Sequence, residues 1–152
     1  MAQKVEKESI FAVNVNTVPM EDLAKQGAVR VQVRYLIDER HGSNRFALRL
    51  YTVHKGGHTP LDQHEHEHNV YVLSGQGLLR ERKENSLGVR QVREGDAIFI
   101  PSNAVHQFIN ERDEPLVFLC VKGNPSLYST SSQCQSHAAP HHDSDRNFCE
   151  FR

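Results

Sequence analysis

Four side chains that can bind a metal ion occur in two separate segments of the chain: Asp62, His64, His68 and His106. Neutral imidazole and carboxylate groups are the usual protein ligands of first-row divalent metals at sites without sulfur. Asp62 and His64 are two residues apart, so on a β-strand their side chains point to the same face. A tight turn through residues 65–67 would return His68 opposite them, and a third strand would supply His106. This spacing predicts one metal site inside a β-barrel.

A solvated polar hairpin is the alternative interpretation of this histidine-rich segment, and His66 is assigned to that class of exposed residue. Burying four polar groups without a ligand would be unfavourable, which favours the metal site. A second register, pairing His64 with His66, would place Val70 at the next ligand position. Valine cannot bind a metal, so this register is rejected. His58 precedes a proline-containing turn and is predicted to lie at the rim of the site.

Length, charge and cysteine content restrict the class of protein. The chain has 152 residues, enough for one domain with a buried core. Its formal net charge of -1 shows no excess of basic residues that would indicate binding to nucleic acid or to a membrane surface. No apolar run is long enough to span a membrane, and residues 1–9 are charged rather than signal-like. The three cysteines form no CxxC pair, which favours a reducing cytoplasm.

Most of the chain has the pattern of short β-strands. Residues 29–34 alternate strictly between apolar and polar types, as a half-buried strand does. Further strands are predicted over 46–53, 70–73, 78–80, 97–100, 107–110 and 116–121, with a break at 55–57 and turns at 84–88 and 93–96. Such a series is typical of a β-sandwich or closed barrel. One helix is predicted over 17–27, where Thr17 could cap the start and Gly27 could end it.

The chain divides into three predicted parts. Residues 1–28 form an N-terminal arm with the short helix, residues 29–123 form an all-β barrel domain, and residues 124–152 form a tail. The tail is rich in Ser and His and poor in aliphatic residues, so it is predicted to be flexible. It carries five further potential ligands, whose role is left open because their spacing fits no closed zinc pattern: Cys134, His137, His141, His142 and Cys149.

The glycines around the predicted ligands extend the pattern into a first sequence motif. Gly56 is followed after five residues by Asp62 and His64, then after three residues by His68, and after six more by Gly75. This spacing resembles the first motif of the cupin superfamily, whose members are small jelly-roll barrels built as a double-stranded β-helix. In that motif, His-x-His and Glu stand at the positions of Asp62, His64 and His68.

A second cupin motif occurs at the expected separation from the first. It requires a glycine, a proline six positions later, a histidine and an asparagine, and these are Gly95, Pro101, His106 and Asn110. Asn103 stands where glycine is usual. Two motifs together form a specific signal, and the resemblance covers residues 45–122. It implies a cupin β-barrel fold.

The resemblance also implies one divalent transition metal per chain: Fe, Mn, Ni or Zn. Asp62 replaces the usual first histidine, and His68 replaces the usual glutamate, as in a four-histidine subgroup of small cupins. Because aspartate is shorter than histidine, direct binding by Asp62 and binding through water are both left open. Some cupins have lost their metal, so a metal-free member is a further alternative.

Other residues are predicted to line the pocket. Arg49 and Tyr51 share one face of the strand before the first motif and are candidates for holding an anionic or carbonyl substrate. The competing interpretation is that these two polar side chains lie on the solvent-exposed face of the strand. Phe108 and Cys120 are predicted to wall the pocket, and a core cysteine is usually inert packing.

An octahedral ion with four protein ligands keeps two positions for a small-molecule substrate, dioxygen or water. The leading hypothesis is a metal-dependent cupin enzyme of small-molecule metabolism, of the dioxygenase type of oxidoreductase. A redox-neutral isomerase, lyase, decarboxylase or polyketide cyclase is the first alternative, and a non-catalytic small-molecule-binding cupin is the second. All occur on this fold, which therefore does not choose among them. The resemblance further implies a homodimer.

Overall fold

The computed structural model describes residues 9–128, which form nine β-strands and three short 3-10 helices. All strand pairs are antiparallel, so the predicted all-β class is confirmed. The strands are β1 (Glu21–Asp22), β2 (Val29–Ile37), β3 (Phe46–His58), β4 (His68–Ser74), β5 (Gln76–Lys83), β6 (Ser86–Arg93), β7 (Ala97–Ile100), β8 (His106–Asn110) and β9 (Leu116–Gly123). The 3-10 helices are η1 (Val15–Thr17), η2 (Glu39–His41) and η3 (Pro125–Leu127).

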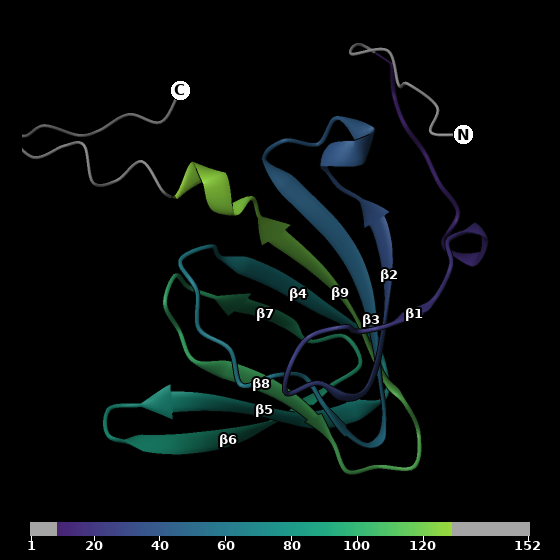
Figure 1. Cartoon of the computed structure of the whole chain (residues 1–152). Helices are drawn as coiled ribbons and strands as arrows, with labels where there is room; N and C mark the ends of the chain where they lie inside the picture. The colour runs from purple at the N-terminus through teal and green to yellow at the C-terminus, as the bar shows by residue number, and fades with distance from the viewer. Residues whose placement is uncertain (1–8, 129–152) are drawn as a thin grey trace, which may run out of the picture.

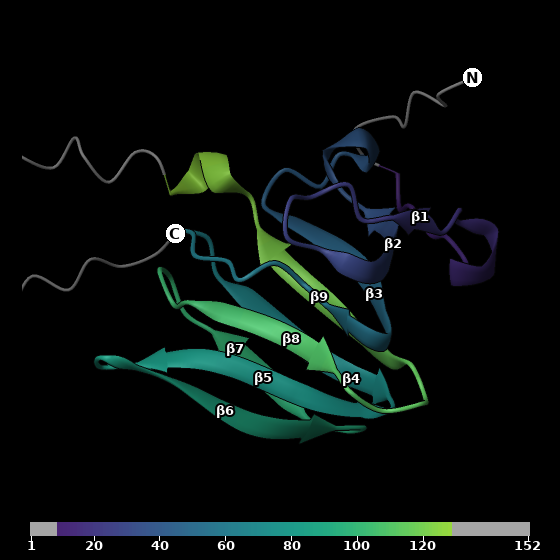
Figure 2. The ribbon, with the colours of Figure 1, turned by 60° about the horizontal axis from the view of Figure 1, so that its bottom comes forward.

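The sheet curls into a half-barrel with two walls (Figures 1 and 2). One wall has the order β6-β5-β8, and the other has the order β3-β9-β4-β7, with β2 and β1 continuing beyond β3. The walls join where β8 pairs with β3 through Gly57 with Asn110 and His58 with Ile109. The predicted jelly-roll barrel is therefore confirmed.

The core follows the two-residue alternation of the strands. Along β9, Leu116, Phe118 and Cys120 are buried, while the residues between them are less so. The side chains buried between the two walls form a single cluster: Val31, Val53, Val70, Val72, Leu79, Val92, Ile100, Phe108, Leu116, Phe118 and Cys120. Part of this cluster also lines the pocket, next to its polar residues.

The predicted break at residues 55–57 is wrong, because β3 continues to His58. A Cβ atom on Gly57 would lie 2.6 Å from the carbonyl oxygen of Val29, so only glycine allows β2 to approach this closely. The register between β2 and β3 shifts at the same place, between Val29 and Val31. The glycine pair therefore forms an irregularity within a continuous strand, and does not end it.

The helix predicted over residues 17–27 is also wrong. The segment contains only the end of η1 and the two-residue strand β1, which pairs with β2. The backbone N–H of Leu23 donates to the carbonyl of Val31, and the Leu23 side chain packs against the core. Isolated helices of this length are marginal in water, so pairing with a strand edge and burial of Leu23 determine the conformation.

Two predictions lie partly or wholly beyond the described residues. The tail donors between Cys134 and Cys149 fall outside residues 9–128, and the boundaries at residues 28 and 123 stay predictions. Within the described part of the chain, no helix has the length and apolar character needed to cross a bilayer.

Candidate metal centre

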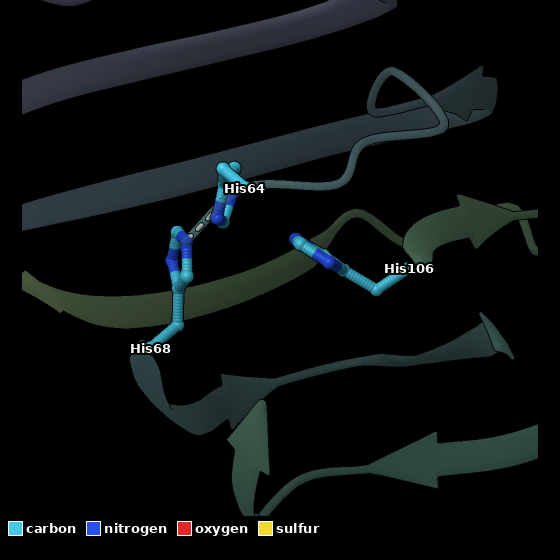
Figure 3. A group of neighbouring side chains, drawn as sticks. All are labelled: His64, His68 and His106. Atoms are coloured by element: carbon cyan, nitrogen blue, oxygen red, sulfur yellow. Dashed lines mark hydrogen bonds between the residues drawn. The ribbon is translucent and has the colours of Figure 1, made fainter. Parts of the chain in front are cut away.

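Three of the four predicted ligands converge at one end of the half-barrel (Figure 3). His68 is the first residue of β4, His106 is the first residue of β8, and His64 lies in the loop between β3 and β4. The Nε2 atoms of His64 and His68 are 3.0 Å apart, and one ring nitrogen from each histidine lies within 4.8 Å of the others. The two strand starts and the loop thus bring imidazoles from distant segments to one point.

Backbone hydrogen bonds hold the two motifs against each other. Asp62 and His106 exchange two bonds, from each N–H to the other carbonyl, of 2.9 and 3.0 Å. The N–H of Asn103 donates to the carbonyl of His64 at 2.8 Å. Asn103 has φ 63°, a left-handed conformation that asparagine tolerates better than most residues. This conformation explains why Asn103 can stand where the cupin motif usually has glycine.

The Nδ1 atom of each of the three histidines has a partner that orients the ring. Nδ1 of His64 donates to the carbonyl of His66 at 3.0 Å, and Nδ1 of His106 donates to the carbonyl of Ala104 at 2.9 Å. Nδ1 of His68 contacts the Sγ atom of Cys120 at 3.0 Å. When Nδ1 carries the proton, the lone pair of Nε2 is free to bind a metal.

The donor set fits a divalent ion. Burial lowers the pKa of His68 to about 2 and also lowers the pKa of His64, so both rings are neutral near pH 7. Metal binding requires neutral imidazole. Two nitrogen ligands about 2.1 Å from one ion and at right angles would lie about 3.0 Å apart. The separation of the His64 and His68 Nε2 atoms matches that value.

Asp62 lies beside the three imidazoles, outside the cluster that they form. Its Oδ2 atom is 3.9 Å from Nε2 of His64 and forms an ion pair with Nζ of Lys25. Burial alone would raise the pKa of the Asp62 carboxyl, but the Lys25 ammonium and the neighbouring His64 hold it below its usual value. Asp62 is therefore an ionised carboxylate that lies between Lys25 of the N-terminal segment and the imidazole of His64.

The assignment of His66 to an exposed surface is wrong. Its side chain is only 9% exposed, and its ring stacks on that of His64 with centroids 3.7 Å apart. Burial lowers the pKa of His66 to about 4, so this ring is neutral as well. The spacing of residues 64, 66 and 68 could have indicated that all three imidazoles face one side. His58 lies outside the pocket, where its ring contacts Gln107.

The imidazoles open onto a cavity with a volume of about 120 Å³. All four residues predicted for the pocket line it: Arg49, Tyr51, Phe108 and Cys120. The lining residues that were not identified from the sequence include Lys25, Phe118 and Lys122. Lys122 alternates with Cys120 and Phe118 along β9, so strand periodicity could have placed it on the inner face.

Aromatic side chains form the inner wall of this cavity. The rings of Tyr51 and Phe118 stack with centroids 5.3 Å apart, and those of Phe108 and Phe118 lie 4.5 Å apart. Burial raises the pKa of Tyr51, so its hydroxyl stays protonated, and burial raises the pKa of Cys120 to about 12. Cys120 is therefore a thiol and not a nucleophilic thiolate at neutral pH.

Comparison with known proteins agrees with this fold. The Cupin_2 model of the cupin domain matches residues 49–122. The solved structure of the polyketide cyclase RemF from Streptomyces resistomycificus has a TM-score of 0.70 and 33% sequence identity, covering 76% of this chain and 80% of that chain. A cupin-2 domain structure from Rhodospirillum rubrum has a TM-score of 0.62 and 28% identity, covering 74% of each chain. The chain belongs to the cupin superfamily.

A characterised relative is similar to about half of this chain. It is 1-methylthio-D-xylulose 5-phosphate methylsulfurylase from Rhodospirillum rubrum, which is 38% identical over 74 residues. The match covers 49% of this chain and 45% of the relative, so the chain spans less than half the length of that protein. Both named enzymes act on small molecules, as their names state.

Proposed function

We propose that this protein is a metal-dependent enzyme that cyclises an oxygen-rich small molecule by a redox-neutral route, as a polyketide cyclase does. The observation that carries this proposal is the set of three convergent imidazoles at an aromatic-walled cavity. The similarity to RemF, which covers 80% of that chain, supports the class of reaction. Residues His64, His68 and His106 would hold the ion, with Asp62 as a fourth ligand either directly or through water.

The proposed step is an intramolecular aldol reaction. A carbon between two carbonyl groups loses a proton and forms a new carbon–carbon bond to the carbon of a third carbonyl group. The oxygen of that third carbonyl gains a proton, and subsequent loss of one water gives the unsaturated ring. No electrons leave the substrate, so no oxidant is needed. A bound divalent ion would supply Lewis-acid polarisation of a carbonyl oxygen.

The chain itself would bind and orient the substrate. The protonated hydroxyl of Tyr51 can donate a hydrogen bond to a carbonyl or enol oxygen. The rings of Phe108 and Phe118 offer flat apolar surfaces to a conjugated chain and exclude water from it. Both effects favour a folded substrate conformation in which the two reacting carbons are close.

The oxidative reaction predicted from the ligand set has the same metal requirement. Neither of the enzymes named above is a dioxygenase, so the redox-neutral alternative now takes precedence. A non-catalytic binding role would use the same cavity without turnover. The three possibilities differ in oxygen consumption and in the mass of the product.

The test is an anaerobic assay of the purified, metal-loaded chain with a panel of linear triketides and tetraketides. Cyclisation predicts a product that has lost one water, with no dependence on dioxygen. A product that has gained two oxygen atoms, together with oxygen uptake in air, would instead support the dioxygenase. Unchanged substrate with every metal, in air and without it, would count against both enzymes and favour a binding protein. The matched control is His68→Ala, which removes one proposed ligand.

Further parts of the proposal concern the metal, the assembly and the cell compartment. The ligand set suits Fe, Mn, Ni or Zn, and metal analysis of protein purified without added metal would identify the ion. We also propose a homodimer in the cytoplasm. Light scattering of the purified chain tests the dimer, and cell fractionation tests the compartment.

A further inference from the structure

Strand register places two cations next to the imidazoles. His68 on β4 and Lys122 on β9 are directly opposite each other, and Cys120 on β9 is directly opposite Arg49 on β3. Opposite residues of an antiparallel pair share one face, and diagonal neighbours are within reach of long side chains. Arg49 and Lys122 are diagonal neighbours, since Lys122 is opposite Ala47. Both line the cavity.

Arg49 has a buried nitrogen without a hydrogen-bond acceptor. Its Nε atom is fully buried and has no partner, and its Nη1 atom makes only a long contact of 3.5 Å to the Tyr51 hydroxyl. The guanidinium lies over the ring of Tyr35, with 5.0 Å between Cζ and the ring centroid. This stacking fixes the plane of the guanidinium but does not satisfy its donors. A buried donor left unpaired is costly, so the position favours a ligand that accepts hydrogen bonds.

Lys122 is half-buried and has no ion-pair partner among residues 9–128. Burial and the positive charge of Arg49 lower its pKa. Two acids that line the same cavity or the neighbouring hollow are engaged elsewhere: Asp62 pairs with Lys25, and Asp38 pairs with Arg40. Glu39, which lines a neighbouring hollow with Arg49 and Lys122, forms no ion pair with either. Two adjacent cations therefore lack a counter-charge in the described part of the chain.

We propose that Arg49 and Lys122 form an oxyanion subsite that binds a carboxylate or phosphate group of the substrate. The inference rests on the proposed function in that it names the class of substrate for the same cavity. The planar guanidinium can donate to two oxygens of one group, and the ammonium adds a compact charge. An anion bound here would lie beside His68, so the substrate would place its charged end and its reacting carbonyls within a cavity of about 120 Å³.

The test measures binding and does not depend on turnover. Benzoate, benzamide and phenylphosphonate share a benzene ring and differ in the charge and shape of the attached group. Their dissociation constants are measured by NMR titration on the full chain, as purified and after chelator treatment. Benzoate or phenylphosphonate is expected to bind at least about tenfold more tightly than benzamide in both preparations. The tighter of the two anions identifies whether the group is a carboxylate or a phosphate.

Matched variants assign that preference to the two residues. Lys122→Met and Arg49→Met keep side-chain length and remove charge, and each is expected to weaken anion binding about tenfold while leaving benzamide unchanged. Lys83→Met, in the β5–β6 hairpin, removes the same charge from a residue that does not line the cavity and should keep the preference. Equal affinity for acid and amide, or a preference that both cavity variants retain, would overturn the subsite. Because chelated protein is included, failure of the cyclase assay would not affect the result.

Discussion

Asp62 and His106 exchange a pair of backbone hydrogen bonds, although four strands lie between them in the sequence. This bridge joins the first motif to the second, so the positions of His64 and His106 are set together. His68 is positioned separately, through the pairing of β4 with β9. Two separate sets of backbone contacts therefore position the site. Variants of the ligand side chains are expected to change metal binding without unfolding the protein.

Replacing His68 is expected to abolish metal binding, whereas replacing His66 is not. His68→Ala removes one of three convergent nitrogens, and the metal affinity should fall by at least about 100-fold. His66→Ala removes a ring that stacks on His64 without reaching the convergence point, so it serves as the matched control. Metal content by elemental analysis, with circular dichroism to confirm folding, measures both. Equal metal content in the two variants would contradict the three-histidine centre.

Asp62 and Lys25 are expected to act on metal affinity in opposite directions. Lys25→Met releases the carboxylate from its ion pair, which should strengthen binding by about 1 kcal/mol, or about fivefold. Asp62→Asn removes the negative charge and should weaken binding by a similar factor. Competition with a chromophoric chelator gives both values. If neither variant alters the affinity, Asp62 serves the N-terminal segment alone and the centre has three protein ligands.

The metal-free protein is expected to lose stability as the pH falls below about 6.5. The folded-state pKa values of His66 and His68 are lowered to about 4 and about 2, whereas an unfolded chain has values near 6.5. Below pH 6.5 the unfolded state therefore binds more protons, so the free energy of unfolding decreases down to the folded-state values. Each group adds a slope of at most about 1.4 kcal/mol per pH unit.

Urea unfolding of chelated protein between pH 7 and pH 4 measures this slope. The double variant His66→Phe, His68→Phe should show a smaller dependence on pH than the parent chain. Identical slopes would mean that other groups dominate the acid response.

Gly75→Ala is expected to destabilise the fold by about 3 kcal/mol. Gly75 has φ 80°, and a Cβ atom there would lie 2.2 Å from the carbonyl oxygen of Pro115. Gly95→Ala is the control, because Gly95 has φ 90° but no atom within 4 Å of the added Cβ. That variant carries only the backbone strain, about 1 kcal/mol. Chemical denaturation of both variants separates the two costs, and equal destabilisation would show that the steric clash relaxes.

Much of the fold and part of the site could be predicted from the sequence. The spacing of the two motifs placed His64, His68 and His106 on converging segments, although His64 lies in a loop and not on the predicted strand. The contact of Lys25 with Asp62 could not be predicted, since it depends on how the N-terminal segment crosses the mouth of the cavity. His66 was misassigned because the conformation of its loop is fixed by residues 101–106, far along the chain.

The helix prediction failed for a related reason. Thr17 and Gly27 are good end signals, but such signals act only when the helix can bury an apolar face. Here the exposed edge of β2 offers backbone partners, and Leu23 reaches the core from an extended chain. Lys122 was missed because a single lysine in a strand is usually exposed, although its alternation with Phe118 and Cys120 along β9 indicated the inner face.

The rate at which the Cys120 thiol is alkylated can be used to measure access to the interior of this barrel. Cys120 is 4% exposed, its Sγ atom contacts Nδ1 of His68, and it lines the cavity, so an alkylating reagent reaches it through that cavity. In a chain with Cys134 and Cys149 replaced by serine, the alkylation rate would report access to the cavity directly. A metal ion bound by His68 should slow the alkylation, so the labelling rate would also report whether the metal centre is occupied.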